Sequence, residues 1–347
     1  MVKIHPKDGI FLESLGGKPT EGKGWKALRR GGHFLLMMPA TSESIRAGAR
    51  LYSPQRKLAK LATSAILKGP GWRWLPHLDW NWRRGSPLDE LLQGTEIPVG
   101  AILLGNPLPE GRRALILTDE RRPRILKLGV GAAASELVAR ERRFIETNCS
   151  RSDLIPSLDL KMGGDNWEAL GIHYFEEGEK AGLSEIAGKL GTWLEKDFQP
   201  MSHLPGWKKL ATSSHPAAAS IAERCRNLSL RPSLVHGDLA PWNVRRKSNG
   251  EVVFIDWEDG RVSDVPCWDS LHFIFQQAAL VRRLRGLKLE TEVRKAMGEG
   301  EFSKLIKTSG WAGHEDLLFA SYLLGMATED LLASALLESK RLGIQQG

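Results

Sequence analysis

The sequence is poor in the features that mark secreted, membrane-spanning or metal-clustered proteins. It has 3 cysteines in 347 residues, and Cys149, Cys225 and Cys267 lack both metal-ligand spacing and the even number of a disulfide framework. No apolar run approaches the roughly 18 residues that span a membrane, and the beginning of the chain lacks a signal-peptide pattern. We therefore expect a cytoplasmic protein with reduced thiols and no membrane span.

The sequence also lacks a concentrated block of charge. Its net charge is +8, but the basic residues are scattered as arginine pairs along the whole length. A scattered excess is more typical of a solvated surface than of a nucleic-acid-binding face, so we do not expect nucleic acid to be the main partner. Hydrophobic residues make up 41% and charged residues 26%, which is typical of a globular chain that folds into two or three packed units.

Residues 1–94 contain little that points to a function. Residues 42–68 have the apolar spacing of a helix, and four tryptophans follow, Trp72, Trp74, Trp80 and Trp82. Such tryptophans can stack on a ligand or a nucleic acid, although they more often pack one layer of a protein against another. We treat residues 1–94 as an N-terminal extension of unassigned role.

From residue 95 the pattern changes to strands and then to helices. Strands are predicted over 99–104, 114–117 and 124–128, a helix over 132–146, and a strand pair between 155 and 174. The acidic stretch 176–179 is typical of a linker, and helices dominate after it. The sequence therefore predicts an α+β protein in two lobes, with a small antiparallel sheet over 95–175 and a mainly helical lobe over 176–347.

The segment 234–258 carries most of the recognisable chemistry. Asn249 and Gly250 form a strong two-residue turn signal between strand-like flanks. If that turn sets the register, Asn243 lies opposite Asp256, with Cβ atoms about 5 Å apart. An amide oxygen and a carboxylate so close together are ligands that Mg²⁺ prefers.

Asp238 lies five residues before Asn243, in a loop that Gly237 and Pro241 interrupt. It can reach the same corner without being a ligand, which suits a carboxylate that orients a hydroxyl group and accepts its proton. Taken singly, an Asp or Asn in a turn is more often a cap or a turn former. The combination and its spacing favour a functional site.

This segment resembles the signature of the aminoglycoside phosphotransferase and choline kinase families, which share the protein-kinase fold. The matching features are His236-Gly237-Asp238, Asn243 five residues later, and Ile255-Asp256 after a short hairpin. The resemblance implies that Asp238 is the catalytic base, assisted by Asn243, and that Asn243 and Asp256 hold Mg²⁺. It also implies that Asp269 and His236 give structural support to the loop.

A phosphoryl-transfer site further needs a cation on the ATP phosphates that an acid holds in place. On the helix predicted over 132–146, Glu141 falls in the middle of an otherwise apolar stripe. A carboxylate that faces inward needs a partner, and Lys127 on the preceding strand is the natural candidate, although a nearby arginine is an alternative. The resemblance implies the same pair, with Lys127 and Glu141 as cofactor-binding residues.

The sequence thus predicts an ATP- and Mg²⁺-dependent kinase that phosphorylates a hydroxyl group of a small molecule, such as a sugar, a glycan precursor or another metabolite alcohol. Two alternatives stay open. The chain could be a non-catalytic member of the fold that binds a nucleotide or a partner. It could also associate with nucleic acid through its basic, tryptophan-containing N-terminal residues.

Overall fold

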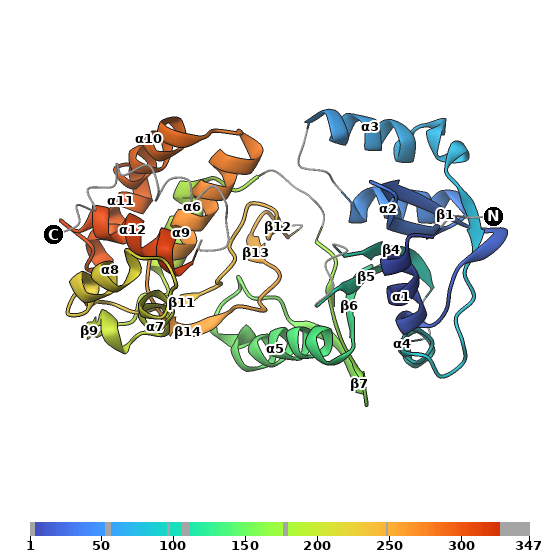
Figure 1. Ribbon diagram of the computed structural model, residues 1–347, viewed down its shortest axis with the longest axis horizontal. Coiled ribbons are helices and arrows are strands. Elements are labelled where there is room, and N and C mark those ends of the chain that lie inside the picture. The colour runs from blue at the N-terminus through green and yellow to red at the C-terminus, as the bar shows by residue number, and fades with distance from the viewer. Residues whose placement is uncertain are drawn as a thin grey trace. The chain divides into compact units, whose positions relative to one another are not determined.

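The computed structural model describes residues 4–52, 57–95, 98–105, 111–175, 180–247 and 249–326. The chain divides into two compact units (Figure 1). The first contains residues 1–177 and the short segment 247–249, and the second contains residues 178–246 and 250–347. The predicted linker 176–179 lies outside the described residues.

An antiparallel sheet forms the centre of the first unit (Figure 1). Its eight strands have the order β3-β1-β2-β4-β5-β6-β8-β7. Their bounds are β1 Thr20–Arg30, β2 His33–Pro39, β3 His77–Asp79, β4 Val99–Leu104, β5 Arg113–Thr118, β6 Arg124–Val130, β7 Leu158–Gly164 and β8 Trp167–His173. The predicted strands from residue 99 onward are therefore confirmed to within a few residues.

Residues 1–94 contribute to this sheet. They supply β1, β2 and β3, and β2 continues the sheet by pairing with β4, with Leu36 opposite Leu103. The sheet is larger than the small one that the sequence predicts, because the N-terminal residues add three strands beside β4. Residues 1–94 and 95–175 share one compact unit, although the sequence sets the first segment apart as an extension.

Helices cover both faces of the sheet. They are α1 Pro6–Leu15, α2 Ser42–Leu51, α3 Lys57–Lys68, α4 Pro87–Thr95 and α5 Ala132–Asn148, with 3-10 turns η1 Pro70–Trp74 and η2 Cys149–Arg151. Along β4, Ile102 packs with α1 and α4, whereas Ala101 packs with α2 and α3. Because neighbouring side chains of a strand point to opposite faces, the two pairs of helices lie on opposite sides of the sheet.

Three of the unit's tryptophans pack against one another. The rings of Trp25, Trp80 and Trp82 meet edge to face, with centroids 5.7 to 5.9 Å apart. Trp80 is buried and donates a hydrogen bond from Nε1 to the carbonyl of Gly17 at 2.6 Å. The packing interpretation therefore holds for Trp80 and Trp82, whereas Trp74 is 89% exposed.

The second unit is mainly helical, as the sequence predicts. Its helices are α6 Leu183–Gly191, α7 Pro205–Ala211, α8 Ala218–Cys225, α9 Trp268–Gln276, α10 Gly286–Met297, α11 Gly300–Ser309 and α12 Glu315–Gly325, with the 3-10 turn η3 Met201–His203 and the π-helical segment η4 Gln277–Val281. Short strands connect them: β9 Gln199–Pro200, β10 Ser229–Leu230, β11 Ser233–Val235, β12 Val244–Arg246, β13 Val252–Phe254 and β14 Arg261–Asp264. The α+β fold class is thereby confirmed.

The core of this unit contains large aromatic side chains that are fully buried, among them Trp257, Trp268, Phe273 and Tyr322. Trp268 and Tyr322 take part in hydrogen bonds between α9 and α12, to Ser321 and His272 respectively. No helix within the described ranges is both long and apolar enough to cross a membrane.

Candidate active site

The predicted ion pair between Lys127 and Glu141 is present in the first unit. Lys127 lies on β6 between Leu126 and Leu128, which face the opposite side of the sheet. Glu141 lies in the middle of α5, is 1% exposed, and accepts a hydrogen bond from Lys127 Nζ. Because both groups are buried, each charge depends on the other for compensation.

Helix α5 is held on the sheet by a second set of charges. Arg142 donates from Nε to Glu168 on β8 at 2.7 Å and from Nη1 to Glu146, one turn along α5, at 3.0 Å. Glu168 lies opposite Gly129 of β6. These contacts fix α5 relative to β6 and β8, and they therefore fix Glu141 relative to Lys127.

In the second unit, Asp269 holds the loop that contains the predicted catalytic residues. It lies in the first turn of α9, is 3% exposed, and accepts hydrogen bonds from the backbone N–H groups of His236 at 2.6 Å and Gly237 at 3.0 Å. Burial raises the pKa of Asp269, and the hydrogen bonds and the neighbouring His236 oppose that shift. Both carboxylate oxygens are used as acceptors, so Asp269 fixes two consecutive peptides of the loop.

Gly237 is required by the shape of this loop. Its φ is +87°, in the region that residues with a side chain rarely adopt. A Cβ atom there would lie 2.5 Å from the carbonyl oxygen of Asp259. The glycine therefore allows the loop to pass close to the segment that follows β13.

His236 connects the same two segments. Its Nδ1 atom lies 3.3 Å from the backbone nitrogen of Asp238, and its Nε2 atom lies 2.9 Å from the carbonyl oxygen of Ile255. The backbone N–H can only donate and the carbonyl can only accept, so the ring carries its proton on Nε2. His236 is fully buried, and these contacts give it a structural place between the loop and the segment 255–260.

The side chain of Asp238 is accessible but held at both oxygens. It is 44% exposed. Asn243 Nδ2 donates to its Oδ2 atom at 3.1 Å and to its backbone carbonyl at 2.8 Å. His272 Nε2 lies 3.0 Å from its Oδ1 atom. The carboxylate is thus fixed in orientation while part of its surface faces outward.

His272 is a further contact of Asp238 that is not among the predicted site residues. It lies on α9 three residues after Asp269, and residues three apart share one helix face. Because Asp269 contacts the loop, the spacing was the available signal that His272 also faces it. The spacing alone does not reveal that its partner is the Asp238 carboxylate.

The register of the hairpin differs by one residue from the predicted one. Val244 pairs with Phe254 and Arg246 with Val252, which places Asn243 opposite Ile255 and not opposite Asp256. Of Asn249 and Gly250, both among the described residues, only Gly250 has a positive φ, +87°. A two-residue type I′ turn needs a positive φ at both positions, so a longer turn forms and shifts the pairing.

Asn243 and Asp256 nevertheless remain close along the backbone. Ile255 donates its N–H to the carbonyl of Asn243 at 2.9 Å, and Asp256 follows at once. Asp256 has a φ of +73°, which is uncommon for a residue with a side chain and occurs often at functional sites. The left-handed conformation turns the chain at the end of the ribbon formed by β12 and β13.

The donor set fits a magnesium ion better than a transition metal. The Nδ2 atom of Asn243 faces two acceptor oxygens of Asp238, which leaves its Oδ1 atom for a cation. Mg²⁺ uses one or two such protein oxygens together with phosphates and water. Within the described residues, no group of three or more His, Cys, Asp and Glu side chains could hold a metal ion.

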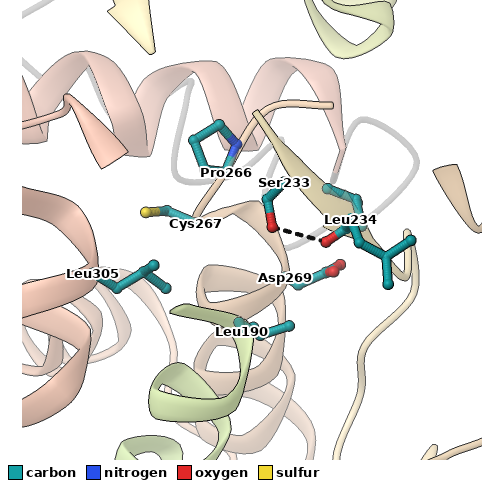
Figure 2. A pocket seen from close by; sticks show the side chains of 8 residues that line it. Leu190, Ser233, Leu234, Pro266, Cys267, Asp269 and Leu305 are labelled. Atoms are coloured by element: carbon teal, nitrogen blue, oxygen red, sulfur yellow. Dashed lines mark hydrogen bonds between the residues drawn. The ribbon is translucent and has the colours of Figure 1, made fainter. Parts of the chain in front are cut away.

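A small cavity lies behind the loop (Figure 2). Its mostly apolar lining includes Leu190, Val235, Cys267 and Leu305, and Asp269 also lines it. The space holds about one water molecule. Burial raises the pKa of Cys267 to about 12. This cavity is a packing defect beneath the loop and is too small for a metabolite.

Residues 106–110, between β4 and β5, lie outside the described residues. On the sheet face that carries Lys127, the neighbouring Leu115 is opposite it on β5 and is only partly buried.

A comparison with protein families finds a match that includes the segment with the motif. Residues 178–290 match the model of the phosphotransferase enzyme family. The predicted resemblance is thereby confirmed. The matched segment begins at the start of the second unit and contains the loop 236–243, Asp256, Asp269 and His272. No curated protein matches the chain.

Several solved structures are similar at low identity. A choline kinase from Streptococcus pneumoniae is 15% identical, with 74% of this chain and 98% of that chain covered and a TM-score of 0.41. A macrolide 2'-phosphotransferase from Brachybacterium faecium is 13% identical, with 74% of this chain and 98% of that chain covered and a TM-score of 0.43. An ethanolamine kinase from Plasmodium vivax is 12% identical, with 87% of this chain and 94% of that chain covered and a TM-score of 0.42.

Proposed function

We propose that this protein is a magnesium-dependent kinase that transfers the γ-phosphoryl group of ATP to a hydroxyl group of a small molecule. The observation that carries the proposal is the environment of Asp238. Its accessible carboxylate is fixed through Asn243 and His272, in a loop that Asp269 holds and that lies in the segment matching the phosphotransferase family.

Asp238 is suited to orient the acceptor and receive its proton. A carboxylate oxygen that already accepts one hydrogen bond keeps a further lone pair for a hydroxyl group. Phosphoryl transfer depends mainly on positioning and on the stabilisation of charge, so a base held at both oxygens is favourable. The 44% exposure of the side chain leaves room for a substrate to approach.

The nucleotide end of the reaction is assigned to Lys127, Asn243 and Asp256. Lys127, held by Glu141, would place a positive charge on the phosphates. The oxygens of Asn243 and Asp256 would hold Mg²⁺, which neutralises phosphate charge when bound. These roles follow the resemblance stated for the sequence, and the donor chemistry of the residues supports them.

A neutral or anionic alcohol suits the acceptor site better than a polycation. The protein carries a net charge of +8, which disfavours the long-range approach of a polycationic substrate. We therefore place sugars, glycan precursors and other metabolite alcohols first among the candidate acceptors.

A phosphorylation screen tests the proposal. The protein is incubated with ATP, Mg²⁺ and a panel of alcohols, and ADP formation is measured with and without each acceptor. We expect at least one acceptor to stimulate turnover, and we expect chelation of the metal to abolish it. Asp238→Asn should lower the stimulated turnover by about 10²- to 10⁴-fold, because it removes the base.

Asp197→Asn provides the matched control, since Asp197 is an exposed carboxylate of the same unit. It should retain wild-type turnover. Nucleotide binding, measured by calorimetry, should survive in Asp238→Asn. The non-catalytic alternative is correct if the purified protein binds ATP, none of the acceptors stimulates ADP formation, and Asp238→Asn leaves the rate of ADP formation unchanged.

A further inference from the structure

We propose that His272, held in place by Tyr322, positions the carboxylate of Asp238 for phosphoryl transfer. The inference rests on the proposed function, because it assigns a role within the same site. It concerns two residues outside the motif from which that function was predicted. His272 is thus a positioning residue, and Asp238 remains the group that contacts the acceptor.

A continuous chain of hydrogen bonds connects the helical core to the base. His272 Nε2 lies 3.0 Å from Asp238 Oδ1, and His272 Nδ1 lies 3.1 Å from the hydroxyl oxygen of Tyr322. Asp238 belongs to the loop after β11, His272 to α9, and Tyr322 to α12. The order Tyr322–His272–Asp238 therefore joins three segments that are far apart in the sequence.

The chemistry of the partners fixes the direction of these bonds. An ionised carboxylate can only accept, so His272 must carry a proton on Nε2. In the neutral ring, Nδ1 is then an acceptor, and the Tyr322 hydroxyl donates to it. Tyr322 thus selects the tautomer that presents an N–H group to Asp238, as an orienting partner commonly does for a functional histidine.

Burial makes this arrangement rigid. Tyr322 is fully buried, and His272 is 7% exposed, whereas the Asp238 side chain is 44% exposed. Loss of the Tyr322 hydroxyl would leave a buried ring nitrogen without its donor, which is costly. The exposed base is therefore held by a buried histidine and a fully buried tyrosine.

The two oxygens of Asp238 have separate holders. Oδ1 accepts from His272 and Oδ2 accepts from Asn243. With only one holder, the carboxylate could rotate about its terminal bond, since such torsions are broad. With both, its plane is fixed. A displacement of about 1 Å in a reacting group can reduce a rate about 10²-fold, so His272 should affect turnover more than substrate binding.

The first test compares kcat with KM in variants of the chain of hydrogen bonds. The assay uses ATP, Mg²⁺ and the acceptor that the screen identifies, or the slow hydrolysis of ATP if the screen yields none. His272→Ala should lower kcat about 10²-fold, with the KM for ATP within about twofold. His272→Gln keeps an N–H donor near the Nε2 position and should recover about tenfold of that loss.

Tyr322→Phe removes only the hydroxyl group and should lower kcat about fivefold, the equivalent of one hydrogen bond. Ser321→Ala is the matched control, because it removes a neighbouring buried hydroxyl of α12 that contacts Trp268 and not His272. Equal losses of kcat in Tyr322→Phe and Ser321→Ala would overturn the proposal, as would His272→Gln being no more active than His272→Ala.

The second test does not depend on activity. Long-range nitrogen–proton NMR spectra of histidine-labelled protein report which ring nitrogen carries the proton. We expect the Nε2–H form for His272 in the wild type and a mixture of tautomers in Tyr322→Phe. The Nδ1–H form in the wild type would overturn the positioning role. If the wild type shows the Nε2–H form but has no turnover with any substrate, the proposed function fails and the hydrogen-bond chain stands.

Discussion

The candidate functional residues of the two units are positioned in different ways. In the first unit, Lys127 and Glu141 form an ion pair between regular elements, the strand β6 and the helix α5. In the second unit, Asp238 lies in an irregular loop that is held through Asp269, His236, His272 and Asn243. A periodic element places a side chain by itself, whereas a loop needs contacts from several segments to place one.

This difference predicts how each set of residues responds to mutation. The ion pair should behave as a local unit, because α5 and β6 remain folded around it. The loop should behave as a connected network, in which the loss of one holder affects groups further along.

Among the changes considered in this comparison, removal of the Lys127 side-chain charge should reduce turnover the most. Lys127→Ala removes the charge assigned to the phosphates and should lower turnover about 10²- to 10³-fold, as the loss of one stabilising donor does in other enzymes. Steady-state kinetics with ATP and the screened acceptor measure this loss. Lys161→Ala is the control, since Lys161 forms an exposed pair with Glu146 in the same unit. Equal activity of the two variants would refute the assignment of Lys127.

Loss of one Asp269 carboxylate oxygen, which accepts a hydrogen bond from the loop backbone, should have an intermediate effect, and this effect should be on the free energy of unfolding. In Asp269→Asn, one oxygen can still accept, but the amide nitrogen faces a backbone N–H of the loop. One buried donor is then unsatisfied, so the free energy of unfolding should fall by about 1–3 kcal/mol. Urea unfolding followed by tryptophan fluorescence measures the change, with Asp197→Asn as the exposed control. An unchanged midpoint would show that Asp269 does not brace the loop.

Chemical labelling of the cysteine thiols should give the smallest effect on the folded protein. Burial raises the pKa of Cys225 and of Cys267 to about 12, so at pH 8 only about one thiol in 10⁴ is ionised. Cys149 is partly exposed. We expect a disulfide reagent to label Cys149 quickly and the other two slowly until the protein is denatured. Rapid labelling of Cys267 in Asp269→Asn would show that the network extends to the cavity behind the loop.

The local patterns of the sequence were sufficient for several features. Alternating apolar residues located the strands from 99 onward, and one apolar helix stripe placed Glu141 inward, where it meets Lys127. These predictions succeeded because the periods of strands and helices determine which side chains share a face. The loop that contains His236 and Asp238 was located through its resemblance to a family signature, which can be read from sequence because the motif is contiguous.

Other features needed the tertiary structure. The hairpin register failed by one residue because Asn249 does not adopt the positive φ that the predicted turn requires. The N-terminal strands could not be assigned to the sheet, since pairing of β2 with β4 joins segments separated by about sixty residues. The contact of His272 with Asp238 and Tyr322 depends on how α9 and α12 pack.

The sequence by itself determined the candidate residues for phosphoryl transfer and, to within a few residues, the strands from 99 onward and the helix that carry Lys127 and Glu141. Only the tertiary structure decided which groups hold the base, how the ribbon is registered, and that residues 1–94 extend the sheet. The physical reason is the sequence separation of the interacting residues. The periodicity of strands and helices depends on neighbouring residues, whereas contacts between distant segments depend on the packing of the whole unit.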